Sequence, residues 1–160
     1  FLHAGDKFHS ANTLELIINQ IEALKVKPDV IYGETAIVSD TGEFLRMRRL
    51  STPKQLNWKS FKKGMVVCHQ AFLPRRILVT KYNLSYRFSS DFDWCIRIMK
   101  ESSFMFDSKN TLIDYLSEGV TTANHKASLI ERFKIMAHHY GFIHTVFYHI
   151  GFLIRSIIKR

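Results

Sequence analysis

Three aspartates stand at positions where a carboxylate could take part in chemistry. Asp6 follows a short apolar and small-residue segment and precedes a predicted helix, the place where ligand and metal groups collect in open α/β sheets. A carboxylate there could hold a divalent cation that also touches a diphosphate, or it could simply cap the helix. Asp91 and Asp93 lie two apart at another predicted helix start. One of them could act as a general base, or both could stabilise the helix dipole.

A polar pair, His69 and Gln70, directly follows the apolar run at residues 65–68. If that run is a strand, both side chains emerge at its end, where they can hydrogen-bond a substrate hydroxyl or phosphate. A histidine that is satisfied by a neighbouring carbonyl group fits the same pattern. The pair is therefore a candidate binding site, with a purely structural role as the alternative.

Apolar runs and turn residues predict the strands that would position these groups. The short buried strands are expected at residues 30–33, 65–68 and 104–106. The segment that ends at Asp6 is expected to be the end of another buried strand. A cluster of turn residues around Gly42 predicts a hairpin between residues 36–38 and 44–47.

Apolar residues at helical spacing predict the helices. The first runs from about residue 10 to Leu24. Pro74 is expected to begin a second helix and Asp91 a third. From about residue 125 the chain is predicted to be helical, with a break or bend near Gly141. Because helices and strands alternate along the chain, the sequence predicts the α/β class.

The composition limits the class of protein. The chain has 160 residues, of which 46% are hydrophobic, with only 7 Gly and 3 Pro, so it can form one core and is too apolar for a disordered tail. Its two cysteines are too few for a disulfide framework or a four-thiolate zinc site. No stretch reaches the roughly 20 uninterrupted apolar residues of a membrane-spanning helix.

The positive charge is concentrated in two regions. The formal net charge is +9, with seven basic residues and no acidic one at residues 44–64, and six basic residues against Glu131 alone from residue 124 to the end. Such surfaces suit phosphates, nucleic acid or an anionic membrane, although a solvated surface without a partner also accounts for them. The sequence contains no helix-turn-helix, zinc-finger or RNA-recognition signature. The positive charge is then the only feature that favours binding to nucleic acid, and nucleic acid is not expected as a partner.

Five segments, in this order, resemble motifs of family 2 glycosyltransferases with the GT-A fold, of the bacterial surface-polysaccharide type. They are residues 2–8 (LHAGDKF), 31–35 (IYGET) with Gly42 after them, 68–76 (CHQAFLPRR), 90–94 (SDFDW) and 116–121 (LSEGVT). In the same order, they resemble the family's metal segment, its Y-G-D-T segment, its H-Q motif, its base motif and a later G-G-V-S turn. Each segment is a weak signal, but the five together are specific.

The resemblance implies a fold and a division of the chain. Residues 1–122 would be the C-terminal part of a GT-A, Rossmann-like mixed sheet flanked by helices. Residues 123–160 would be a helical, basic and apolar extension. The activity implied is that of an inverting glycosyltransferase of the hexosyltransferase type. It would move a sugar from a nucleotide-diphosphate donor to an acceptor hydroxyl in polysaccharide or glycolipid synthesis.

The resemblance also assigns roles to individual residues. Asp6 matches the metal ligand, which would hold Mn²⁺ or Mg²⁺ against the donor phosphates. Asp91 matches the general base that takes the acceptor proton. The positions that match substrate-binding residues are Gly5, His69, Gln70, Asp93 and Trp94.

The sequence departs from the family pattern in several places. His3 replaces the usual Asn or Asp of the metal segment, Glu34 stands where Asp is usual, and Glu118 stands where Gly is usual. The family binds the nucleotide with a βαβ half that precedes the metal segment, and this chain begins at that segment. The resemblance therefore predicts that the N-terminal nucleotide-binding half is missing and that the 160 residues alone bind a nucleotide sugar poorly.

The two basic regions suggest where the acceptor and the membrane would lie. The loop at residues 46–63 could attract a lipid-linked diphosphate or an anionic glycan acceptor, or it could be a mobile solvated loop. The tail at residues 141–160 has a wide apolar surface and a narrow polar seam, which predicts a helix lying on the cytoplasmic membrane face. Packing on the missing half or on a second copy in a homodimer is the alternative.

The expected location is cytoplasmic and peripheral on the inner membrane. Two other functions remain open at this point: a non-catalytic, membrane-associated remnant of such an enzyme, and a basic nucleic-acid-binding domain.

Overall fold

The protein is described from a computed structural model that covers residues 2–117 and 124–158. Its strands are β1 (Lys7–Phe8), β2 (Val30–Val38), β3 (Phe44–Met47), β4 (Phe72–Pro74) and β5 (Met105–Leu116). They form one sheet in the order β1-β5-β2-β3, and β4 also pairs with β2. Strand β5 runs parallel to β2, whereas the other pairings are antiparallel. The predicted α/β class and mixed sheet are therefore confirmed.

Strand β2 is the centre of the sheet, and eight of its nine residues are buried. Strand β5 pairs along one edge of β2, while β3 and β4 share the other edge, β3 opposite Ala36–Val38 and β4 opposite Val30–Tyr32. The register between β2 and β5 shifts between Tyr32 and Thr35. At this irregularity Lys109 of β5 has φ +59°, a left-handed conformation that is uncommon outside glycine.

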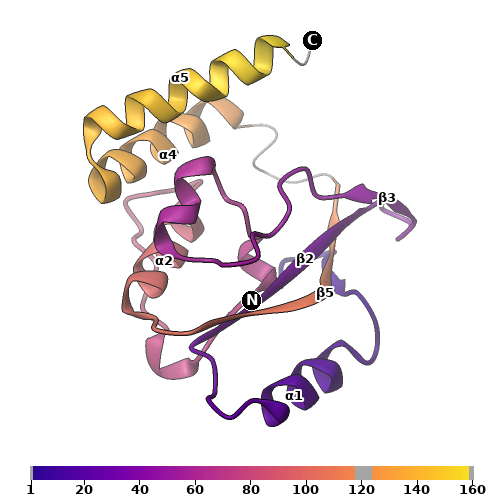
Figure 1. Ribbon diagram of the computed structural model, residues 1–160. Coiled ribbons are helices and arrows are strands. Elements are labelled where there is room, and N and C mark those ends of the chain that lie inside the picture. Colours follow the sequence, from indigo (N-terminus) through magenta and orange to yellow (C-terminus); the bar gives the residue numbers. More distant parts are fainter. Residues whose placement is uncertain (1, 118–123, 159–160) are drawn as a thin grey trace.

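The helices cover both faces of the sheet, as Figure 1 shows. They are α1 (Thr13–Ala23), α2 (Ser90–Glu101), α4 (His125–Tyr140) and α5 (Phe142–Ile158), with short 3₁₀ turns η1 (Trp58–Lys63), η2 (His69–Ala71) and η3 (Arg76–Leu78). Helix α1 packs Ile17 into a small core with Ile31 and Leu112. On the opposite face Tyr32 and Phe92 belong to the larger core that η1, α2 and α4 share.

Side chains alternate across β2, which explains the two cores. Val30 and Tyr32 point to the larger core, and Ile31 between them points to the smaller one. The Tyr32 hydroxyl donates to the carbonyl oxygen of Pro53 at 2.9 Å and accepts the N–H of Leu56 at 3.2 Å. This buried phenol therefore holds the basic loop after β3 against the sheet.

Several predicted elements are confirmed. The structure has the helix that ends near residue 24, the hairpin of β2 and β3, the helix at Asp91, and the helical C-terminal region, which is interrupted at Gly141. Gly141 has φ +87°, a conformation that favours glycine at the end of a helix. The loop at residues 50–64 contains only the short turn η1, as expected.

Three predicted elements are wrong. Residues 65–68 are buried but form no strand, because their apolar side chains pack into the core while no neighbouring strand pairs with them. Pro74 does not begin a helix; it ends β4 and pairs with Val30, and only the short turn η3 follows. Residues 2–5 are exposed and lie outside any strand, so the expected end of a buried strand is absent from the described part of this segment.

Helices α4 and α5 form a hairpin on the outer side of α2 and η1 (Figure 1). Four large apolar side chains of α5 follow one another along an exposed stripe, which we call the α5 stripe: Ile143, Phe147, Ile150 and Ile154. Within the described residues, none of the helices has the length and apolar character needed to cross a membrane.

Candidate functional site

Asp6 lies in a tight turn that fixes its carboxylate against the end of β5. Gly5 has φ +91°, and a side chain there would meet Leu116 at 2.8 Å, so this turn requires glycine. The N–H of Leu116 donates to Asp6 Oδ1 at 2.8 Å, and the side-chain amide of Gln70 donates to Asp6 Oδ2. The Asp6 carboxylate is therefore held by one strand end and by the turn η2.

Asp91 lies at the start of α2 and faces His69. His69 Nδ1 lies 3.2 Å from Asp91 Oδ2, and the N–H of Phe92 donates to Asp91 Oδ1 at 2.8 Å. The other ring nitrogen of His69 lies 3.0 Å from Nε2 of the exposed His3. The Asp91 side chain is 26% exposed, so it is still accessible to solvent.

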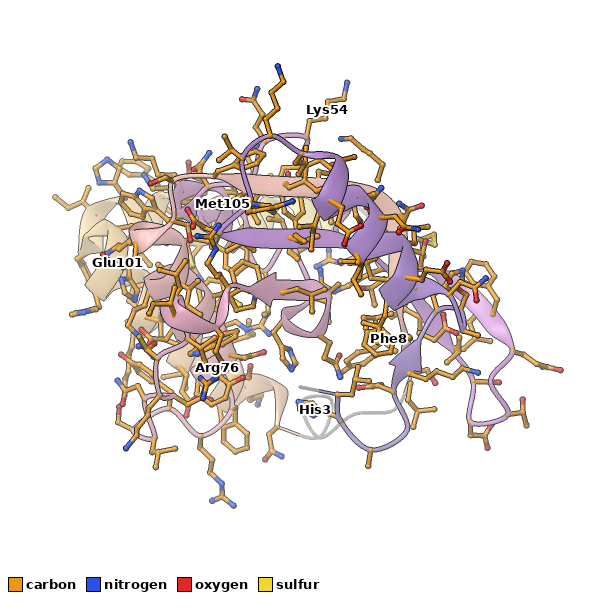
Figure 2. The ribbon with its side chains drawn as sticks, turned by 90° about the horizontal axis from the view of Figure 1, so that it is seen from below. His3, Phe8, Lys54, Arg76, Glu101 and Met105 are labelled. Carbon is orange, nitrogen blue, oxygen red and sulfur yellow. The ribbon has the colours of Figure 1, made fainter. Side chains whose placement is uncertain are left out.

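These contacts bring Asp6 and Asp91 to one corner of the molecule, although 85 residues separate them in the sequence. The bridge is the neighbouring pair in η2, because Gln70 contacts Asp6 and His69 contacts Asp91. In Figure 2, His3 and Phe8 lie away from Glu101, the last residue of α2. The corner is thus built at the N-terminal end of that helix.

The electrostatics of this corner produce an ion pair. Burial alone would lower the pKa of His69, but the hydrogen bonds and charges of Asp91 and, to a smaller extent, Cys68 outweigh burial and raise that pKa to about 9. Burial would likewise raise the pKa of Asp91, yet His69 holds it below its usual range. At neutral pH the corner therefore contains an imidazolium and an ionised carboxylate.

Cys68 adds a buried thiol to the same corner. Its S–H donates to the side-chain carbonyl of Gln70 at 3.4 Å, which leaves the Gln70 amide free to face Asp6. Burial would raise the pKa of the Cys68 thiol, but the neighbouring His69 more than offsets burial and the pKa is lowered. Cys68 thus helps to fix the orientation of Gln70.

Two arginines near this corner were not among the predicted site residues. Arg48 follows β3, is half-buried, and interacts electrostatically with Asp91 and Cys68; burial lowers its pKa. Arg132 of α4 lies with its guanidinium carbon 6.0 Å from the ring centre of Phe92, beside Asp91. Both lie in the basic regions visible in the sequence, but that signal does not distinguish them from their solvated neighbours.

Two predicted substrate-binding residues, Asp93 and Trp94, are not brought to this corner. Asp93 is buried and paired, at 2.8 Å in each case, with Nε of Arg97 and Nε2 of His139. Trp94 is 3% exposed, and its indole N–H donates to the carbonyl oxygen of Thr80 at 2.8 Å. Both side chains are therefore used to attach α2 to its neighbours, Asp93 to α4 through His139 and Trp94 to the segment around Thr80.

Apart from Leu116, the other segments that resemble family motifs lie outside this corner or outside the described residues. Glu34 accepts hydrogen bonds from the N–H and the hydroxyl of Thr52, at 2.9 and 2.7 Å, and so holds the basic loop. Gly42 lies in the β2–β3 turn with φ +86°. Of the segment 116–121, residues 118–121 lie outside the described residues, so Glu118 cannot be placed.

Asp6 is the side chain in this corner that fits a divalent cation. Within the described part of the chain it forms no ion pair with a basic side chain, and no group of three His, Cys, Asp or Glu residues is arranged as a metal site. Mg²⁺ and Mn²⁺ commonly take one or two carboxylates and complete their shell with waters and substrate phosphates. A single carboxylate therefore suits a cation that arrives with a phosphate-bearing ligand.

A shallow cavity of about 280 Å³ lies elsewhere, between the start of α1 and β5. Its polar lining includes His9, Thr13, Lys109 and Asn110. None of the predicted site residues lines it. The predicted site residues therefore lie at the corner and not in this cavity.

Comparison with known proteins does not assign the chain to a family. A scan of protein-family models finds no match, and a search of curated proteins finds none. What the residues at this corner do is therefore a question of their geometry and chemistry.

Proposed function

We propose that this chain is the part of an inverting, GT-A-type glycosyltransferase that carries the metal ligand and the general base. It would transfer a sugar from a nucleotide-diphosphate donor to an acceptor hydroxyl in polysaccharide or glycolipid synthesis. The observation that carries this proposal is the meeting of Asp6 and Asp91 at one corner through the His69–Gln70 bridge. The five resembling sequence segments support it.

In this proposal Asp91 accepts the proton of the acceptor hydroxyl. The acceptor oxygen forms a bond to the anomeric carbon while the bond from that carbon to the diphosphate breaks, and the leaving nucleoside diphosphate takes the electron pair. The proton passes to Asp91. His69 keeps Asp91 ionised at neutral pH, so the carboxylate can accept a proton that is transferred late in the reaction.

Asp6 would supply the carboxylate for the divalent cation. When bound, Mn²⁺ or Mg²⁺ neutralises the charge that grows on the diphosphate as it leaves. The Leu116 N–H and the Gln70 amide orient the Asp6 carboxylate, and the turn at Gly5 keeps it close to β5. Gln70 thus positions Asp6 in the same way that His69 positions Asp91.

The nucleotide itself would be bound by a βαβ unit that precedes this region in a GT-A sheet. Both ring nitrogens of His69 already have partners, Asp91 and His3, so the exposed His3 would be the imidazole that hydrogen-bonds a substrate hydroxyl or phosphate oxygen.

The proposal includes an anionic membrane surface as a partner of the α4–α5 hairpin. Phe147 in the α5 stripe is 70% exposed. Glu131 is the one acidic residue after position 123, and its carboxylate is occupied by the N–H groups of Arg87, Phe88 and Ser89. The charged groups of the hairpin that remain without such partners are basic. Exposed apolar side chains together with basic groups suit a layer of anionic lipid headgroups.

The test of the activity is a screen of nucleotide-diphosphate sugars with and without Mn²⁺, followed by Asp91→Asn on the productive donor. We expect the substitution to lower the rate about 100-fold or more, because a general base contributes that much. Donor binding should persist, since Asp91 faces the acceptor. Asp40→Asn, at an exposed turn, is the matched control and should retain full activity.

Equal rates for the wild type and Asp91→Asn would remove Asp91 as the base. If no nucleotide sugar is consumed under any condition, the activity itself is wrong.

A further inference from the structure

Two guanidinium groups converge on the corner from different elements. Arg48 arrives from the end of β3, and its backbone N–H is fixed by the carbonyl oxygen of Thr35 at 3.0 Å. Arg132 arrives from α4 and lies over the ring of Phe92. Phe92 follows Asp91 directly and donates its N–H to the Asp91 carboxylate, so Arg132 lies beside Asp91, and the charges of both arginines act on that carboxylate.

Neither guanidinium has a carboxylate partner within the described residues. Among residues 2–117 and 124–158, the guanidinium of Arg48 makes only a long contact, from its Nη1 to the carbonyl oxygen of Leu50 at 3.4 Å. Nε of Arg132 is buried and has no hydrogen-bond partner among the described residues. A buried guanidinium N–H that is left unsatisfied costs free energy unless a ligand accepts it.

Among the described residues, no acidic side chain near the corner pairs with either arginine. Asp91 pairs with His69, Asp6 accepts hydrogen bonds from Gln70 and Leu116, and Glu131 accepts them from three backbone N–H groups. Neither arginine therefore has an ion-pair partner in the described part of the protein. This distinguishes them from Arg97, which pairs with Asp93 at 2.8 Å.

We infer that Arg48 and Arg132 form a subsite for a phosphate or diphosphate group beside Asp91. The inference deepens the proposed function and depends on it for the role of the bound anion. Guanidinium groups present paired N–H donors that match the oxygens of a phosphate, and two of them balance a doubly charged anion. The bound group belongs either to the nucleotide donor or to a lipid-linked acceptor.

This subsite is distinct from the Asp6 position because it needs no cation. Asp6 can bind a phosphate only through a metal ion, since like charges repel, whereas the arginines bind it directly. Binding of pyrophosphate in the presence of a chelator therefore isolates the arginine subsite.

The experiment is a calorimetric titration of the whole protein with pyrophosphate in excess EDTA. We expect saturable binding that Arg132→Gln and Arg48→Gln each weaken at least tenfold. Arg49→Gln, which removes an exposed arginine next to Arg48, should bind within twofold of the wild type. Arg132→Lys should recover part of the lost affinity because it keeps the charge.

A second measurement does not depend on how the variants fold. Phenylglyoxal modification of the unmodified protein, mapped by mass spectrometry, should be slowed by pyrophosphate at Arg48 and Arg132 but not at Arg49. Equal protection at all three sites, unchanged affinity in both Gln variants, or binding that EDTA abolishes would overturn the inference.

Two further titrations distinguish the sources of the anion. Tighter binding of uridine diphosphate than of pyrophosphate would assign the subsite to the donor, and tighter binding of farnesyl diphosphate would assign it to a lipid acceptor. Pyrophosphate binding without any sugar transfer would keep the subsite and reject the glycosyltransferase. Sugar transfer that is unaffected by Arg132→Gln would keep the glycosyltransferase and reject the subsite.

Discussion

At the residue scale, the side chain that joins the candidate site together is His69. One ring nitrogen contacts Asp91 and the other contacts His3, and the adjacent Gln70 contacts Asp6. Its position in the single turn η2 lets two neighbouring side chains reach opposite carboxylates. A longer regular element at this point would have directed the two side chains elsewhere.

The pairing of His69 predicts a pH-dependent contribution to stability. Because the folded pKa of His69, about 9, lies above its ordinary value of 6.5, the contribution is fully present below about pH 6.5 and is lost as the pH rises through 9. Asp91 stays ionised across this window. His69→Gln should therefore lower the free energy of unfolding by about 3 kcal/mol near pH 6 and by much less near pH 10.

Urea unfolding at both pH values measures this difference. His144→Gln, which changes an exposed histidine of α5, is the control and should show the same small effect at each pH. A His69→Gln effect of equal size at the two pH values would mean that the ion pair does not stabilise the fold.

How far the site could be predicted from sequence differs from residue to residue. The meeting of Asp6, Asp91, His69 and Gln70 at one corner could be predicted, because the segments that contain them resemble, in their order along the chain, a known set of motifs. The inward turn of Trp94 could not, because an aromatic residue at a helix start fits a core and a binding site equally well. Whether such a ring is buried depends on what packs against the helix, which local sequence does not contain.

At the element scale, the length of β2 and β5 was underestimated for a physical reason. In β5 the polar run from Asp107 to Asn110 has the composition of a turn, and the pairing with β2 is irregular there. The strand continues because Ser108 is buried and Lys109 takes a left-handed conformation. Long-range pairing overrides local preference at this point.

Gly33 is the residue of β2 that makes this irregular pairing possible. A Cβ atom at Gly33 would lie 2.6 Å from the backbone oxygen of Asn110, which cannot move without disturbing the sheet. Gly33→Ala should therefore destabilise the protein by about 2–3 kcal/mol, measured by urea unfolding. Gly151→Ala, in α5 with nothing within 4 Å, should instead stabilise it by about 0.5–1 kcal/mol.

If Gly33→Ala left the free energy of unfolding unchanged, β2 and β5 would lie farther apart at this point than described.

At the scale of the whole molecule, the charged and apolar surfaces are arranged around the α4–α5 hairpin. The α5 stripe consists of the exposed side chains Ile143, Phe147, Ile150 and Ile154. Helix α5 itself lies at the outer edge of the molecule in Figure 1. Turn η1, with Lys59 and Lys62, contacts both helices of the hairpin. An apolar strip beside basic groups is the arrangement expected of a protein that rests on anionic lipid.

The membrane proposal predicts a loss of lipid binding when the stripe is made polar. The double variant Ile143→Ser with Phe147→Ser should lower co-sedimentation with phosphatidylcholine–phosphatidylglycerol vesicles about tenfold or more, because two large apolar side chains no longer leave water. Ile77→Ser is the matched control, since Ile77 is 85% exposed on a different part of the molecule and should bind as the wild type does.

Binding should also weaken as salt rises and as phosphatidylglycerol is withdrawn. If the double variant binds vesicles normally but shifts a dimer to a monomer in sedimentation experiments without lipid, the stripe is a protein–protein contact instead.

The attachment of α4 to the residues before Asp91 has a mechanical consequence. The Glu131 carboxylate accepts hydrogen bonds from three successive backbone N–H groups at positions 87–89. The hydroxyl oxygens of Ser89 and Ser128 lie 3.1 Å apart. We therefore expect the α4–α5 hairpin and the start of α2 to move together. Whatever surface carries the hairpin would then fix the height of Asp91 above it. A substrate anchored in that surface would need a head group long enough to reach Asp91. Substrates with shorter head groups would then not react, even though no contact in the site discriminates against them.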